Sequence, residues 1–252
     1  MLQVYSFGQT DIGLKRSNNE DAFLCRPDLA IGAVADGMGG AASGEVASKI
    51  FVDTALEVFS AAGHPTERDN YLLVQETFRL ANERILNGAR NDPRYRGMGC
   101  TAEVFAVSDQ NYVIGHVGDS RTYRSRQGEL KQLTRDHSLI QDQVDQGLIT
   151  LEEAQRHSLR NVILRAVGIE ETLAVDITRG KGIPGDSFLL CSDGLTSAVE
   201  DQLIQDVLSL PMDLSQKVEK LIHLAKSAGG NDNITVVLCE LNQGTVRSDL
   251  EE

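Results

Sequence analysis

Residues 33–40 of the chain read AVADGMGG, an apolar run that ends in an aspartate and then in glycines, just before a helical pattern begins. We interpret the run as a buried strand and its end as a metal site. Asp36 offers a carboxylate, and Gly37 has no Cβ, so its backbone carbonyl can approach a cation closely. Carboxylate and carbonyl oxygens are the ligands that Mg²⁺ and Mn²⁺ prefer.

Three further aspartates lie among glycines and small polar residues at the ends of apolar runs: Asp119, Asp193 and Asp232. Each alone is as readily explained by a turn, because Asp-Gly and related pairs are common turn sequences. Together with Asp36 they predict carboxylates that converge on one site. The chain has no paired cysteines and no histidine pair at helical spacing, so these oxygen ligands favour Mg²⁺ or Mn²⁺ over Zn²⁺.

The composition of the 252 residues indicates a globular protein with a sizeable core, because 41% of them are hydrophobic. A formal net charge of −13 argues against nucleic acid or an anionic membrane surface as the partner. There is no signal-peptide pattern and no span of ~18 apolar residues, so we expect a soluble, cytoplasmic protein without membrane insertion. No C-x-x-C pair occurs, and we expect free, buried thiols: Cys25, Cys100, Cys191 and Cys239.

The hydrophobic periodicity predicts strands in runs and helices in pairs. Strands are expected at residues 3–11, 22–25, 30–35, 101–107, 112–117, 121–124, 172–178, 187–191 and 234–241. Helices are expected at residues 43–58, 74–85, 201–208 and 214–225. Residues 101–124, with short turns between their strands, resemble an antiparallel meander. The order predicts one α+β domain over residues 1–242, with antiparallel sheets covered by helices, and a polar, acidic tail at 243–252. We expect a monomer.

Residues 137–165 form a charged region with short helical segments at 141–144 and 151–155. The region could be a mobile lid or an ordinary helical insertion packed on a sheet. Periodicity reports which face of a segment is buried and says nothing of its motion. Both interpretations therefore stay open on sequence grounds.

Other chemistries fit the chain less well. Residues 37–42 match the G-x-G-x-x-A pattern of dinucleotide-binding loops. Asp36, however, would face the pyrophosphate with a negative charge, and a second helix follows where a parallel strand is required. The chain has no Walker A sequence, no Ser-His-Asp arrangement and no G-x-S-x-G elbow, which disfavours a P-loop site and acyl-enzyme chemistry. His116 is interpreted as a hydrogen-bonded structural residue.

Arg16 lies in a polar loop, four residues before Glu20 and five before Asp21. A surface arginine is usually solvated and without a specific role. A guanidinium beside a metal cluster can nevertheless hold a phosphate through paired hydrogen bonds. Arg16 is therefore a candidate phosphate ligand.

Seven short motifs of glycine, acidic and small polar residues lie along the chain between about Gly8 and Leu241. They are Gly8-x-Thr10-Asp11-x-Gly13-x-x-Arg16-x-x-Asn19-Glu20-Asp21, Ala35-Asp36-Gly37-Met38-Gly39-Gly40, Gly99-x-Thr101, Gly118-Asp119-Ser120-Arg121, Asp136-His137-Ser138, Ser192-Asp193-Gly194 and Asp232-Asn233-Ile234-Thr235. In sequence and in order these motifs resemble those of the metal-dependent protein phosphatases of the 2C type (PPM), and the bacterial serine/threonine branch most. The resemblance implies a four-layer αββα sandwich, with two stacked antiparallel β-sheets flanked by helix pairs.

The resemblance also implies a metal centre. Asp36 would bridge two Mn²⁺ or Mg²⁺ ions, with the Gly37 carbonyl on one ion. Asp193 and Asp232 would bind the other ion. Asp119 matches the position that, together with Asp193, holds a third and weaker ion in bacterial members.

Further roles follow from the same resemblance. Glu20 and Asp21 would bind or orient metal-held waters, and Arg16 matches the phosphate-binding arginine. Residues 137–165 correspond to the flap beside the active site, which affects substrate choice in the family. Animal members carry a histidine after the Asp-Gly pair, proposed as the general acid, whereas this chain has Met38. The acid that protonates the leaving group stays open, and a metal-bound water is our suggestion.

The implied activity is the hydrolysis of phosphoserine and phosphothreonine by direct attack of a water or hydroxide that bridges two metal ions ~4 Å apart. No phospho-enzyme is required. The expected partners are phosphorylated proteins, as substrates of a serine/threonine kinase, and the kinase itself. Two alternatives stay open, a pseudophosphatase that acts as a binding or scaffold domain and a hydrolase of small phosphate esters.

Overall fold

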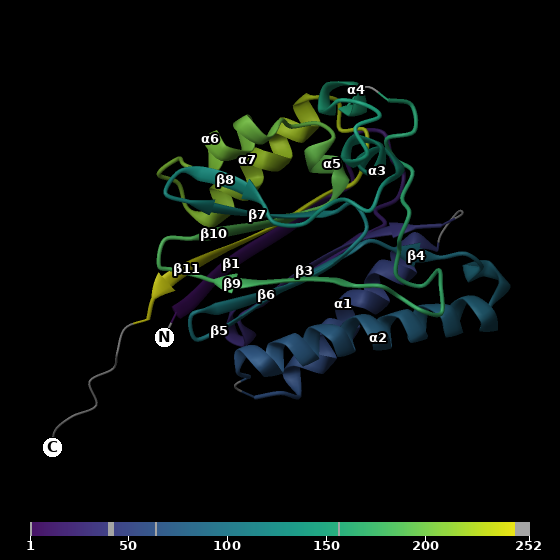
Figure 1. The fold of residues 1–252 in the computed structure, drawn as a ribbon, viewed down its shortest axis with the longest axis horizontal. Coiled ribbons are helices and arrows are strands. Elements are labelled where there is room, and N and C mark those ends of the chain that lie inside the picture. Colours follow the sequence, from purple (N-terminus) through teal and green to yellow (C-terminus); the bar gives the residue numbers. More distant parts are fainter. Residues whose placement is uncertain (1, 40–42, 64, 156, 245–252) are drawn as a thin grey trace, which may run out of the picture.

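The computed structural model of the protein describes residues 2–39, 43–63, 65–155 and 157–244. Two antiparallel β-sheets lie face to face, and helices cover both outer faces (Figure 1). This is the four-layer α+β sandwich that the resemblance implied, and the fold prediction is confirmed.

The two sheets are built from strands that are far apart in the sequence. The first sheet has the order β1-β11-β10-β7-β8. Its strands are β1 (Leu2–Asp11), β7 (Arg121–Arg126), β8 (Glu129–Gln132), β10 (Ser187–Cys191) and β11 (Ile234–Gln243). The second sheet has the order β2-β3-β5-β6-β9, and β4 pairs with β3. Its strands are β2 (Asp21–Arg26), β3 (Ile31–Met38), β4 (Gly99–Cys100), β5 (Ala102–Ser108), β6 (Asn111–Val117) and β9 (Asp176–Lys181).

The helices form the outer layers. The second sheet is covered by α1 (Gly44–Ser60) and α2 (Glu67–Asn91), and the first by α5 (Asp193–Thr196), α6 (Asp201–Leu208) and α7 (Leu214–Ser227). Two short helices, α3 (Leu139–Asp145) and α4 (Leu151–Gln155), lie at the end of the sandwich away from the start of β1 (Figure 1). Short 3-10 turns occupy Pro27–Leu29 and Pro93–Tyr95.

Three clusters of buried apolar side chains fill the three spaces between the four layers. Strand β5 contributes to two of them, because its side chains alternate between its faces. Val104 packs beneath α1 and α2, whereas the neighbouring Phe105 points between the sheets. The ring of Phe105 stacks on Phe188 of β10, with ring centroids 4.4 Å apart. Because neighbouring side chains of β5 point to opposite faces, this one strand packs against the helices on one side and against the first sheet on the other.

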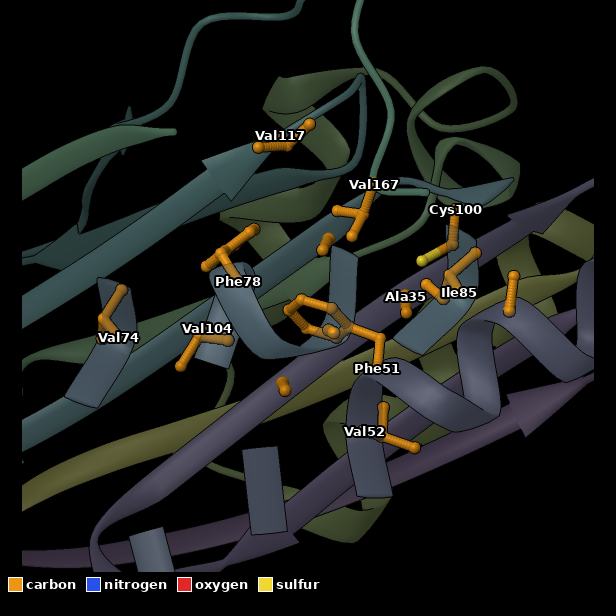
Figure 2. Close-up of a cluster of buried hydrophobic side chains, with 14 of the residues drawn as sticks. Ala35, Phe51, Val52, Val74, Phe78, Ile85, Cys100, Val104, Val117 and Val167 are labelled. Atoms are coloured by element: carbon orange, nitrogen blue, oxygen red, sulfur yellow. The ribbon is translucent and has the colours of Figure 1, made fainter. Parts of the chain in front are cut away.

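The cluster beneath α1 and α2 holds these helices against the second sheet (Figure 2). The rings of Phe51 from α1 and Phe78 from α2 meet edge to face, with centroids 5.0 Å apart. Helix α2 begins in a capping box, in which Thr66 and Asp69 each accept a hydrogen bond from the other's backbone N–H. The capping box sets where α2 starts, and its apolar face sets what the helix packs against, so the two features are consistent with each other.

The meander predicted for residues 101–124 is wrong, because β7 leaves the sheet of β5 and β6 and pairs with β10 in the other sheet. The chain crosses at residues 118–120. Gly118 has a φ of +113°, and a Cβ on it would lie 2.5 Å from the side chain of Thr101. The crossing needs glycine for its backbone conformation and for this close approach.

Other differences concern the ends of strands. The strand predicted at residues 172–178 is wrong at its start, because β9 begins at Asp176. Leu173 and Val175 pack against the cluster beneath α2 without joining the ladder, so their apolar alternation has a different cause. The sequence also missed β4 and β8, which have two and four residues. Strand β11 reaches Gln243, one residue into the predicted tail. The rest of that tail, from 245, lies outside the described residues.

The cysteines and the helices also bear on the expectations of free, buried thiols and of no membrane insertion. All four cysteines are free thiols, of which Cys25 is only half-buried. Among the residues that the structure describes, no helix has the length and the apolar character needed to cross a membrane.

Candidate active site

The aspartates singled out in the sequence lie at strand ends of both sheets. Asp36 of β3 faces Asp21 of β2 in the antiparallel register. Asp119 lies in the turn from β6 to β7, Asp193 opens α5 directly after β10, and Asp232 precedes β11. The other four carboxylates all contribute, after burial, to a pKa of Asp36 well above its ordinary value. The structure therefore brings these five side chains together.

Hydrogen bonds tie the end of β3 to the Asp119 turn. The backbone N–H of Asp36 donates to Thr101 Oγ1 at 3.2 Å, and the N–H of Thr101 donates to the carbonyl of Asp36 at 2.9 Å. Thr101 Oγ1 also lies 2.7 Å from Ser120 Oγ, next to Asp119. One threonine thus fixes the spacing between two of the acidic positions.

Two glycines let backbone segments approach at the site. A Cβ on Gly37 would lie 2.2 Å from the carbonyl oxygen of Gly44 and 2.4 Å from that of Glu20. A Cβ on Gly194 would lie 1.9 Å from the carbonyl oxygen of Asn233. No side chain fits at either position, so the glycine that follows Asp36 and the one that follows Asp193 are required by packing as well as by any ligand role.

Asp21 is held by one of its two oxygens. Its Oδ2 accepts hydrogen bonds from Ser192 Oγ at 2.8 Å and from Thr235 Oγ1 at 2.6 Å. Its Oδ1 is buried and has no hydrogen-bond partner among the described residues. Burial, opposed by the two hydroxyl groups, raises the pKa of Asp21 to about 7. A buried carboxylate oxygen without a partner is rare in folded proteins and calls for a water or a cation.

Arg16 lies in the loop between β1 and β2 and reaches the same place. Its Nη2 donates to Asp232 Oδ2 at 2.7 Å, while about half of its side chain (52%) remains exposed. Glu20 lies nearby, and burial followed by the charge of Glu45 raises the pKa of Glu20, whereas Arg16 lowers it. Arg16 therefore places a guanidinium at the solvent side of the site.

Burial and mutual repulsion perturb the remaining carboxylates. Burial, followed by the charge of Asp193, raises the pKa of Asp119 to about 7. Burial, followed by the charge of Asp232, raises the pKa of Asp193 to about 6, although a hydrogen bond with Asp36 lowers it. Carboxylates crowded in this way bind protons or cations to offset their repulsion.

Two observations indicate that the acidic residues of the site suit a divalent cation. The donors are all oxygen, as Mg²⁺ and Mn²⁺ require, and the buried Oδ1 of Asp21 lacks a partner. Within the described parts of the chain, no three histidine, cysteine, aspartate or glutamate side chains already form a metal-binding group.

The region predicted as a flap begins beside the Asp119 turn. The N–H of Gly118 donates to His137 Nδ1 at 3.1 Å, and the N–H of His137 donates to the carbonyl of Gly118 at 2.7 Å. The far end of the region returns to the same residue, because the N–H of Leu164 donates to the carbonyl of His137. Helices α3 and α4 are therefore anchored at the site.

His116 is structural, as predicted, because its two ring nitrogens bond to the buried Glu103 carboxylate and to the carbonyl of Arg135.

Sequence reasoning assigned no role to several residues that hold the aspartates in place. Most of them adjoin an aspartate in the motifs, which was the available signal, but only the fold shows their partners. They are Thr101, Ser120, Ser192, Asn233 and Thr235.

A family model for protein phosphatase 2C matches residues 14–239. The chain belongs to the protein phosphatase 2C family. It is 36% identical to the protein phosphatase PhpP of Streptococcus pneumoniae over 241 residues, which cover 93% of this chain and 96% of PhpP. It is 38% identical to the serine/threonine protein phosphatase PstP of Mycobacterium tuberculosis over 240 residues, which cover 92% of this chain and 44% of PstP.

Solved structures of this family share the fold. The crystal structure of the Mycobacterium tuberculosis phosphatase PstP has a TM-score of 0.89 at 35% identity, over 95% of this chain and 99% of that one. The catalytic domain of PstP in complex with two manganese ions has a TM-score of 0.88 at 34% identity, over 96% of this chain and 100% of that one. The family and the enzyme class predicted from the sequence, protein-serine/threonine phosphatase, are confirmed.

Proposed function

We propose that the protein is a Mn²⁺- or Mg²⁺-dependent phosphatase that hydrolyses phosphoserine and phosphothreonine in proteins by direct attack of water. The observation that carries this proposal is the set of buried carboxylates that raise one another's pKa beside the exposed guanidinium of Arg16. Such a set needs cations, and cations with an arginine complement a phosphate dianion. The serine/threonine phosphatases among its relatives support the same conclusion.

The residues that would hold the ions are Asp36, the Gly37 carbonyl, Asp193 and Asp232, and Asp119 would hold a third with Asp193. When bound, two ions would supply a bridging water of lowered pKa and would neutralise charge on the phosphoryl oxygens. The two manganese ions in the PstP structure support this proposal.

The chain's own side chains would orient the reactants. Only one nitrogen of Arg16 is engaged by Asp232, so its remaining donors can bind two phosphoryl oxygens. Asp21, fixed through Oδ2, would accept a hydrogen bond from water through Oδ1. Glu20 would accept from a second water. Met38 has no proton to give, and we propose that water protonates the leaving alkoxide.

The substrates would be cytoplasmic phosphoproteins produced by a serine/threonine kinase, with the kinase itself as one of them. A monomer suffices for the proposed chemistry, because every proposed group comes from one chain.

The direct test is phosphate release from a phosphothreonine peptide. We expect turnover with Mn²⁺, none after EDTA, and a higher kcat/KM for the peptide than for a small phosphate ester. Activity that survives EDTA would refute the metal requirement. A failure of every divalent cation to give turnover would favour a pseudophosphatase, and equal kcat/KM values would favour a small-ester hydrolase.

A further inference from the structure

One buried side chain makes three hydrogen bonds to the backbone of the loop that carries Arg16. The Nδ2 of Asn233 donates to the carbonyl of Ile12 at 3.0 Å and to that of Asn18 at 2.9 Å. Its Oδ1 accepts the N–H of Glu20 at 2.9 Å. We infer that Asn233 is the positioning residue for Arg16, which sets where the guanidinium meets the substrate phosphate. The inference rests on the proposed role of Arg16.

Other hydrogen bonds hold the two ends of this loop. Asn18 Nδ2 donates to Glu45 Oε2 at 3.2 Å, and Asn19 Nδ2 donates to Thr10 Oγ1 at 2.8 Å. The N–H of Leu14 donates to the carbonyl of Gly230 at 2.7 Å, and the N–H of Gly13 donates to Asp11 Oδ1 at 2.8 Å. Within the described residues, 15–17 make no backbone hydrogen bond, and the only side-chain bond among them is that of Arg16 to Asp232. The bonds from Asn233 thus fix the loop on both sides of Arg16.

The chemistry of the contact selects asparagine. Both hydrogens of the amide point at carbonyl oxygens, and its oxygen points at an N–H, so the side chain must be a donor twice and an acceptor once. Asn233 is 5% exposed, so water does not replace a lost partner easily. Aspartate would keep the acceptor and would place a second oxygen against two carbonyl groups.

Asn233 is itself held rigidly. Its carbonyl oxygen contacts Gly194 so closely that a Cβ there would lie 1.9 Å away. Its N–H donates to Asp232 Oδ1 at 2.8 Å. The residue therefore links the Arg16 loop to the two segments that carry Asp193 and Asp232. Its side chain, in contrast to its backbone, bonds to backbone groups of the loop, at Ile12, Asn18 and Glu20.

The test is a double-mutant cycle on the Mn²⁺-loaded enzyme with a phosphothreonine peptide. We expect Asn233→Ala to raise KM about fivefold or more, with a smaller change in kcat, because loosening the loop costs Arg16 part of its charge-assisted hydrogen bond. In an Arg16→Ala background the same substitution should change KM less than about twofold, since the group that Asn233 positions is gone. An equal rise in KM in both backgrounds would overturn the inference.

Asn82→Ala is the matched control. Asn82 is also buried, at 4% exposed. It bonds three backbone groups, donating to Glu170 and Glu171 and accepting from Gly168 N–H. The Asn82→Ala substitution should lower the free energy of unfolding about as much as Asn233→Ala does, and should leave KM within about twofold of the wild-type value. A similar rise in KM for both variants would reduce Asn233 to a general stability role.

A measurement without substrate separates this inference from the proposed function. In the metal-free protein, the hydrogen-bonded amides of Gly13 and Leu14 should exchange faster in Asn233→Ala than in the wild type, and at an unchanged rate in Asn82→Ala. If the alanine variant does not fold, Asn233→Asp serves instead, because it keeps the size and loses both donors. Unchanged exchange would refute the positioning role. If Arg16→Ala alters neither KM nor kcat, the phosphate role of Arg16 fails, while the exchange result still decides whether Asn233 orders the loop.

Discussion

At the scale of the residue, the site is a set of acids that cannot all be ionised without counter-charge. The pKa of Asp36 is raised well above its ordinary value. Burial is the main cause, followed by the charges of Asp21, Asp193, Asp119 and Asp232. Arg16 offsets part of this charge through Asp232. A neutral isostere at any of these positions would relieve part of this repulsion, and under the proposed function it would also remove a cation ligand.

Replacement of a proposed ligand should remove activity without removing the fold. We expect Asp193→Asn or Asp36→Asn to lower kcat by more than about 100-fold, because an amide binds a divalent cation far less well than a carboxylate. The measurement is Mn²⁺-dependent turnover together with calorimetric Mn²⁺ binding. Asp28→Asn, at an exposed partner of Arg26, is the control and should keep its rate. An unchanged rate in either variant at the site would exclude the two-metal assignment.

Arg16→Ala should act mainly on substrate binding. We expect KM for phosphopeptides to rise about tenfold, because the guanidinium binds a group that is present in the ground state and the transition state alike. The loss of its ion pair with Asp232 should not weaken Mn²⁺ binding, and calorimetry measures this separately. A KM and kcat both equal to those of the wild type would contradict the phosphate role.

At the scale of the element, helices α1 and α2 hold the second sheet from outside, and their contact depends on aromatic side chains. Phe51 and Phe78 are fully buried and meet edge to face. Because β3, which carries Asp36, lies beneath the same cluster, the helix pair supports the strand that carries the site.

Removal of the Phe78 ring should therefore cost stability first. We expect Phe78→Ala to lower the free energy of unfolding by about 3–5 kcal/mol, measured by urea denaturation. Leu72→Ala on the same helix should cost less than about 1 kcal/mol, because Leu72 is 52% exposed. Similar losses for the two variants would mean that the cluster does not hold the helix.

At the scale of the whole molecule, the acidic site opposes folding unless protons or cations are bound. Asp21 and Asp119 have a pKa of about 7 in the folded protein, and Asp193 of about 6, against an ordinary value of 3.8. The folded state thus binds more protons than the unfolded chain between these values. A group with a raised pKa contributes its stability fully below about pH 3.8, and loses it as the pH rises through 6 to 7.

The metal-free protein should accordingly be less stable at pH 7.5 than at pH 5, by an amount on the order of 5 kcal/mol, because each raised pKa contributes about 1.4 kcal/mol per pH unit below it. Urea unfolding in EDTA measures this difference. Asp119→Asn should reduce the difference, because the amide does not titrate, and saturating Mn²⁺ should abolish or reverse it, because cations then replace the protons. A metal-free protein that becomes more stable toward pH 7.5 would show that the carboxylates are not coupled.

The sequence by itself determined the fold class, the family and the identity of the acidic residues. Asp36 and Gly37 end an apolar run, and that pattern is local, as are the helix periods and the caps. The tertiary structure alone decided how these local elements pair and which side chains hold them together. That β7 crosses to the other sheet depends on the approach of Gly118 to Thr101. The unpaired oxygen of Asp21, and the attachment of the Arg16 loop to Asn233, depend on partners more than 100 residues away. Periodicity reports which face of a segment is buried, whereas a hydrogen bond between distant segments exists only once both sheets have packed.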